Sequence, residues 1–99
     1  MVRIVWTEVS LRDLREIFEY ISEDSFRYAN LTVNKIYRGA QVISLNPYSG
    51  KIDPLFKKTS ARKLIIDNYS IIYRIKSDIQ VDILRVFHSS RQLKRNIIR

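Results

Sequence analysis

Between residues 10 and 45, apolar residues recur at helical spacing in two successive segments. The first helical face carries Leu11, Leu14, Ile17, Phe18 and Ile21, and the second carries Ala29, Val33, Ile36, Ala40 and Ile43. The polar segment 22–25 breaks this pattern and is predicted to be a turn. Two amphipathic helices joined so closely are predicted to form an antiparallel hairpin.

The ends of these helices carry signals of their own. Ser10, followed three residues later by Asp13, matches a capping box, so the first helix is predicted to begin near Ser10. The second helix is predicted to run from about Phe26 to Ile43. It ends there because Pro47 excludes the residue before it from helical backbone angles.

Strands are predicted on either side of the hairpin. They cover residues 2–6, 62–66, 69–75 and 79–88, and residues 46–61 are predicted to be a loop. Two-residue turns at 67–68 and 77–78 join the last three strands, which fixes their register. Counting back from the turns places Arg62 opposite Tyr73, Tyr73 opposite Asp82, and Ser70 opposite Arg85.

This register divides the last three strands into two faces, because residues directly opposite each other share a face. One face is nearly all apolar and is expected to receive the helices; it carries Leu64, Ile66, Tyr69, Ile71, Tyr73, Ile75, Leu84 and Val86. The other face mixes aliphatic residues with cations, and carries Lys63, Ile65, Ser70, Ile72, Arg74, Ile79, Val81, Ile83, Arg85 and Phe87. We expect either residues 90–99 or a partner protein to cover that second face. The predicted fold class is α+β, with two N-terminal antiparallel helices packed on a small, mainly antiparallel sheet in one domain spanning residues 1–99.

Composition narrows the functional class. The chain has 99 residues and a formal net charge of +8, which favours a polyanionic partner such as nucleic acid, a ribosome or an acidic protein. It contains no cysteine, no apolar run of the roughly 20 residues that a membrane span needs, and no secretory signal pattern. We therefore expect a cytoplasmic protein without disulfides, metal or cofactor, and without a membrane partner.

Several segments, taken in order, resemble the RelE/ParE family of bacterial toxins. They are Trp6-Thr7 with Asp13-Leu14, Ile17 and Tyr20-Ile21, then Leu45-Asn46-Pro47 with Gly50, then Arg62-Lys63-Leu64, Tyr69–Tyr73, and Ile83–Arg91 with its His-x-x-Arg ending. The resemblance covers essentially the whole chain. It implies the toxin of a type II toxin–antitoxin system of the plasmid-stabilisation type, silenced by a cognate antitoxin that wraps its surface.

The sheet register and the basic segments supply candidate surfaces for these partners. The antitoxin is expected on the second face of the sheet, at Lys63, Ile65, Ile72, Arg74, Ile83, Arg85 and Phe87. Candidates for target contact are Arg91, Lys94 and Arg95 in the basic tail, or Arg27, Lys35 and Arg38 on the hairpin. The toxin could assemble as a homodimer or as a heterotetramer with its antitoxin.

The family divides by target. ParE-like members poison DNA gyrase and have no established hydrolytic site, whereas RelE-like members cut messenger RNA on the ribosome. The ribonuclease branch typically has an arginine directly after the first tyrosine of the Tyr-x-x-x-Tyr strand, where this chain has Ser70. A neutral hydroxyl cannot supply the charge that stabilises a scissile phosphate. The ParE-like branch, acting on gyrase, is therefore the primary hypothesis.

The alternative hypothesis is a ribosome-dependent endoribonuclease. Its catalytic residues would be His88, Arg85 and Arg74, with Lys63 as a further candidate. His88 is a candidate general acid or base because an imidazole titrates near neutral pH. For His88 the structural interpretation is a strand-end hydrogen bond, and for the arginines it is a solvated or ion-paired surface. Arg62 is interpreted as structural, in a row with Tyr73 and Asp82. A plain nucleic-acid-binding module is a third hypothesis, although no groove-reading motif supports it.

Overall fold

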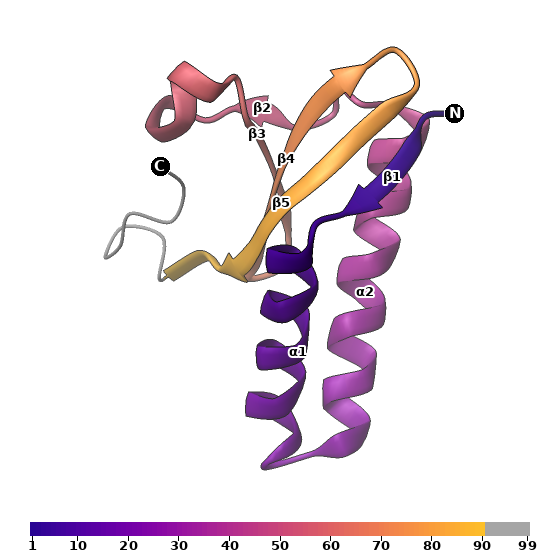
Figure 1. The fold of residues 1–99 in the computed structure, drawn as a ribbon. Coiled ribbons are helices and arrows are strands. Elements are labelled where there is room, and N and C mark those ends of the chain that lie inside the picture. The colour runs from indigo at the N-terminus through magenta and orange to yellow at the C-terminus, as the bar shows by residue number, and fades with distance from the viewer. Residues whose placement is uncertain (91–99) are drawn as a thin grey trace.

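The computed structural model describes residues 1–90, apart from the side chains of residues 55–57. Its elements are β1 (Arg3–Trp6), α1 (Glu8–Ser22), α2 (Phe26–Leu45), β2 (Lys51–Ile52), a 3-10 helix (Pro54–Thr59), β3 (Arg62–Ile66), β4 (Tyr69–Ser77) and β5 (Gln80–His88). The sheet has the order β1-β5-β4-β3-β2, and the two helices lie side by side against it (Figure 1). The predicted α+β architecture is confirmed, and the predicted 46–61 loop contains the short β2 and the 3-10 helix.

The sheet is antiparallel except at one edge. β1 pairs with β5 in parallel, with Trp6 opposite Ile83, and the chain between these two strands forms the helical hairpin and then β2, β3 and β4. β1 ends where the chain turns into α1, so the second half of β5 has no strand beside it on that side. This is where α1 contacts the sheet.

Helix α1 begins earlier than its predicted start at Ser10. Thr7 is the N-cap, and its side chain accepts a hydrogen bond from the Ser10 backbone N–H at 3.2 Å. The Thr7 hydroxyl also donates to the Ile83 carbonyl at 2.7 Å, which fastens the helix start to β5. The predicted capping box of Ser10 and Asp13 was therefore wrong: Ser10 is buried, and Asp13 contacts the sheet instead.

The main core lies between the hairpin and one face of the sheet. Its fully buried members are Ile36, Ala40, Ile43, Ile71, Tyr73, Val81, Ile83 and Val86. The predicted inner face of α2 is confirmed, with Ala29, Ile36, Ala40 and Ile43 all buried. On α1 the predicted face holds at Leu14 and Ile17, whereas Leu11 is half exposed.

The predicted register is confirmed between β3 and β4 and wrong between β4 and β5. Ile66 lies opposite Tyr69 and Arg62 opposite Tyr73, as expected. The second turn lies one residue later than predicted, because Ser77 pairs with Gln80, and irregularities follow at Ile75/Ser77 and Ile72/Tyr73. As a result Val81 and Ile83 belong to the helix-side core, and Leu84 packs on the opposite face.

The Tyr73 hydroxyl fixes the loop between α2 and β2. It accepts a hydrogen bond from the Gly50 N–H at 2.8 Å and donates to the Pro47 carbonyl at 2.7 Å. Arg62 donates to the Gly50 carbonyl at 2.8 Å and lies over the ring of Tyr48. Arg62 is therefore structural, as expected, although its partners are loop groups and not Asp82.

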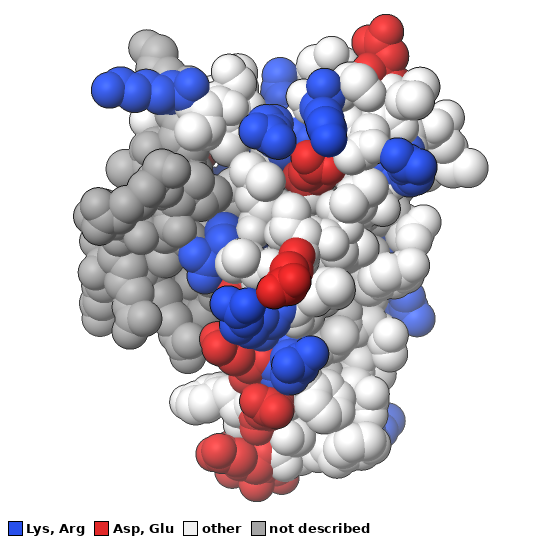
Figure 2. Space-filling model, viewed as in Figure 1, with Lys and Arg blue, Asp and Glu red and all other residues white. Residues whose placement is uncertain are grey.

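Charge is unevenly distributed over the molecule. Residues 8–24 hold six carboxylates against two arginines, so this segment carries −4, and the rest of the chain carries +12. On the face shown in Figure 2, acidic side chains gather along α1 towards the free end of the hairpin. Among residues 1–90, neither helix combines the length and apolar character of a membrane span.

Candidate functional site

The face of the sheet opposite the helices presents three cations, each set by the strand register. Lys63, Ile72 and Arg85 form one cross-strand row through β3, β4 and β5. Ile72 belongs to the small cluster on this side of the sheet, so Lys63 and Arg85 share its face. Arg74 lies further along β4, directly opposite Asp82.

Each of these cations is paired with a carboxylate. Lys63 Nζ lies 3.2 Å from Asp53 Oδ2, and Arg74 Nη2 lies 3.3 Å from Asp82 Oδ2. Arg85 makes a two-pronged contact with Asp13, at 2.8 Å and 3.0 Å. All three carboxylates are largely buried. Separating any pair would therefore leave a poorly solvated charge, so these ion pairs hold the cations in place.

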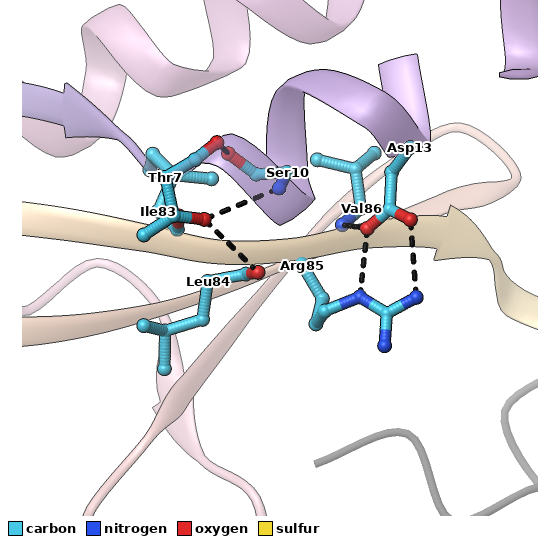
Figure 3. Close-up of polar contacts among 7 residues, drawn as sticks. All are labelled: Thr7, Ser10, Asp13, Ile83, Leu84, Arg85 and Val86. Carbon is cyan, nitrogen blue, oxygen red and sulfur yellow. Dashed lines mark hydrogen bonds and ion pairs between the residues drawn. The ribbon is translucent and has the colours of Figure 1, made fainter. Parts of the chain in front are cut away.

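The Asp13–Arg85 pair ties α1 to the unpaired edge of β5 (Figure 3). Asp13 Oδ2 also accepts the backbone N–H of Val86 at 2.9 Å, at a position that β1 does not reach. One carboxylate thus satisfies a strand-edge donor and neutralises a half-buried guanidinium. Sequence reasoning assigned Asp13 to the capping box and missed this contact, which joins residues 72 positions apart.

Local hydrogen bonds shift the pKa values of Arg85 and Asp82 in the direction that favours their charged forms. The hydrogen bond that Arg85 donates to Asp13 raises the pKa of Arg85 and outweighs the opposing effect of burial. The pKa of Asp82 is lowered by the hydrogen bonds from Gln80 and Arg74, again against burial. The side chains of Gln80 and Arg74 approach Asp82 at 2.8 Å and 3.3 Å. Burial therefore does not neutralise Arg85 or Asp82 at neutral pH.

Ser70 and His88 form local contacts at the far end of the sheet. Ser70 is fully buried, lies opposite Phe87, and shares a 3.0 Å hydrogen bond between its Oγ and that of Ser89. The expectation that Arg85 lies across from Ser70 was wrong. His88 Nδ1 lies 2.7 Å from the Ser90 hydroxyl and accepts the Ser90 N–H at 3.2 Å, and its ring meets Tyr69 edge-on.

The residues proposed for ribonuclease chemistry are spread along the sheet. His88 on β5 lies opposite Tyr69 on β4. Arg74 lies five positions after Tyr69 on β4, so roughly 17 Å separates Arg74 from the position of His88 along the sheet. Arg85, opposite Ile72, lies between them and is bound to Asp13. Within residues 1–90, no three His, Cys, Asp or Glu side chains come together to hold a metal ion.

Comparison with known proteins assigns the family. A family model described as the ParE toxin of the type II toxin–antitoxin system parDE matches residues 4–93. The chain belongs to the ParE toxin family. It is 36% identical over 92 residues to a Sinorhizobium fredii protein named "Putative toxin Y4kP", with 91% of each chain covered. The predicted toxin family, in its ParE-like branch, is confirmed.

A solved structure shows the same fold. The chromosomal ParDE toxin–antitoxin system from P. aeruginosa contains a chain that superposes with a TM-score of 0.72 at 22% identity. The match covers 89% of the present chain and 96% of the other. At this identity the likeness concerns the arrangement of helices and strands, and it agrees with the ParE family assignment.

In this ParE-family toxin, the residues predicted to contact an antitoxin occupy three different environments. Ile65 is 56% exposed, and Lys63 and Arg74 reach the surface from the same face of the sheet. Ile72 and Phe87 are buried with Ala61 and Leu84 in the small second cluster. Ile83 lies in the helix-side core, because the register differs from the predicted one. Three target-contact candidates, Arg91, Lys94 and Arg95, lie outside the described residues.

Proposed function

We propose that this ParE-family toxin arrests growth by binding DNA gyrase, without cleaving RNA, and that a cognate antitoxin silences it. The observation that carries the proposal is the pairing of Lys63, Arg74 and Arg85 with buried carboxylates. Phosphoryl transfer depends on cations oriented towards a developing negative charge. Guanidinium groups already bound by Asp13 and Asp82 are poorly suited to that role, and Ser70 adds no charge.

The antitoxin surface that fits this proposal is smaller than the predicted one. Ile65 supplies exposed apolar area, Lys63 supplies a cation two residues before it on β3, and Arg74 supplies another further along the same face. A sheet face that combines an exposed aliphatic residue with cations suits an extended or helical segment of an acidic protein. Ile72, Ile83 and Phe87 expose too little area to contribute directly.

The test uses the purified toxin in two parallel assays. We expect it to abolish DNA supercoiling by gyrase and to leave a reporter message intact in a defined translation system. The antitoxin, added first, is expected to restore supercoiling. His88→Ala should retain full inhibition, because the His88 ring is engaged locally with Ser90. Cleavage of the message on translating ribosomes, lost in His88→Ala, would instead establish the ribonuclease hypothesis.

A further inference from the structure

One flank of α2 presents a helix-packing seam that the described chain leaves exposed. Its residues recur every three or four positions, and are Tyr28, Leu31, Lys35, Arg38, Val42 and Leu45. At 100° per residue they form a stripe about 100° wide, the pattern of a helix that packs against a partner. The four apolar members are between 48% and 72% exposed.

The fold directs this stripe away from the core. The buried face of α2 is formed by other residues, including Ala29, Ile36 and Ala40. On another flank α1 packs beside α2 (Figure 1). Tyr37 of α2 stacks on Trp6. The seam is therefore a third surface of α2.

A groove runs between the first half of this seam and the β3–β4 hairpin. It has a volume of about 520 Å³ and is lined by Tyr28, Leu31, Thr32, Lys35, Ile36, Arg38, Ile66, Asp67, Asn68 and Tyr69. Gly39 allows α2 to lie this close to β3, since a Cβ there would be 2.6 Å from Ile66 Cγ1. Lys35 Nζ bridges the groove to Asp67 at 2.7 Å.

Charge indicates what this surface would bind. Helix α2 carries Arg27, Lys35 and Arg38 and no carboxylate, and Asp67 offsets one of the two cations in the groove. A partner helix packed on the seam would meet apolar residues at both ends and positive charge in the middle. Carboxylates at its central positions and apolar residues on either side would complement this surface.

Two other occupants fit less well. A second copy of this chain, packed antiparallel on the same seam, would bring Lys35 and Arg38 against the same residues of its partner, and like charges destabilise such a contact. Nucleic acid prefers a continuous basic track with stacking platforms. Tyr28 and Tyr69 line this groove, but its cations do not form a continuous track, because aliphatic walls at Leu31, Ile36 and Ile66 and the carboxylate of Asp67 interrupt them.

We propose that the groove and seam of α2 receive an acidic amphipathic helix of the antitoxin. The inference rests on the proposed function, in which an antitoxin binds this toxin. It adds a second contact surface, separate from the sheet face that carries Ile65 and Arg74.

The test compares two matched substitutions in binding experiments. The probe is the small acidic protein encoded beside the toxin, titrated calorimetrically against wild type, Leu31→Asp and Leu11→Asp. Leu31 and Leu11 are 53% and 49% exposed, and Leu11 lies on α1, outside the groove. We expect Leu31→Asp to weaken binding about tenfold or more and Leu11→Asp to have little effect. Leu31→Ala, which adds no charge, should show a smaller loss in the same direction, with unfolding midpoints as the check on folding.

The outcomes separate the two proposals. If the wild-type toxin binds tightly and neither Leu31→Asp nor Leu31→Ala weakens the binding, the helix-groove inference is overturned. The proposal that an antitoxin binds this toxin would then still stand. The absence of any wild-type complex would overturn the proposed function and this inference with it. If the wild-type toxin is a dimer and Leu31→Asp dissociates it, the groove binds a second copy instead. If Leu31→Asp weakens binding of a fluorescent oligonucleotide and leaves antitoxin binding unchanged, the groove binds nucleic acid instead.

Discussion

The carboxylate of Asp13 accepts three hydrogen bonds, two from the Arg85 guanidinium and one from the Val86 backbone N–H. It is largely buried, so its charge is stabilised by these donors instead of by water. Replacing it by alanine would leave a half-buried cation and a strand-edge donor without their partner. The pair is therefore expected to contribute more to stability than an exposed ion pair does.

We predict that Asp13→Ala lowers the free energy of unfolding by about 2–4 kcal/mol, measured by urea denaturation. The matched control is Glu8→Ala, which breaks the exposed pair of Glu8 and Arg12 on the same helix and should cost less than about 1 kcal/mol. Asp13→Asn, which keeps one acceptor for Val86, should fall between the two. Equal losses for Asp13→Ala and Glu8→Ala would show that the pair does not anchor α1.

The lowered pKa of Asp82 leads to a prediction about acid stability. The unfolded chain binds a proton at Asp82 near pH 3.9, and the folded protein does so only at lower pH, so stability rises with pH in that interval. The contribution is complete above about pH 4 and is lost as the pH falls through the folded-state pKa. Asp82→Asn should be less stable than wild type at neutral pH, and the difference should shrink below about pH 4. Urea midpoints across this range test it, and a constant difference would contradict it.

At the level of elements, local patterns predicted the helices and the first hairpin well. The apolar residues of α2 recur at an uninterrupted helical period, which marks a single face of the helix for burial. The β3–β4 register follows from the two-residue turn at Asp67-Asn68, where Asp67 adopts a positive φ of 53°. In both cases the signal lies within a few residues of the feature it determines.

The β4–β5 register could not be obtained in the same way. β5 is buried on both faces, so alternation does not define which residues face the helices. The adjacent apolar residues Ile83 and Leu84 do lie opposite the irregularity between Ile72 and Tyr73. Val86 and Phe87 are also adjacent and apolar but belong to a regular ladder, so such pairs do not locate the interruption. The irregularity between Ile75 and Ser77 changes the pairing by one residue, so Ile83 lies opposite Tyr73 in the core and not on the predicted antitoxin surface.

In the candidate site, too, features determined by nearby residues were predicted and contacts between distant residues were not. The cations of the sheet face were predicted from strand alternation, and Lys63, Arg74 and Arg85 do lie on that face. The carboxylates that pair with these cations were not predicted. The Asp13–Arg85 pair, for example, depends on the parallel β1–β5 edge, which places α1 beside β5. A polar residue at a buried helix position, as at Ser10 and Asp13, is the sequence signal that could have indicated this contact.

On the scale of the whole molecule, the uneven charge gives the toxin a preferred direction of approach. Residues 8–24 carry −4 and the remainder +12, so an acidic partner is attracted to the surfaces away from the acidic end of the hairpin. Such a field acts over about a Debye length, roughly 10 Å at 0.1 M salt. It affects the rate of encounter more than the lifetime of the complex.

We therefore predict that the association rate with the acidic antitoxin falls about tenfold or more between low and high salt, while the dissociation rate changes little. Arg38→Glu and Arg15→Glu alter the net charge equally, and both side chains are exposed. Arg38 lines the α2 groove, whereas Arg15 lies on acidic α1. If the local field directs the encounter, stopped-flow measurements at low salt should show a slower association for Arg38→Glu than for Arg15→Glu. Equal slowing would mean that net charge alone determines the rate, and a rate independent of salt would mean that electrostatics does not guide the encounter.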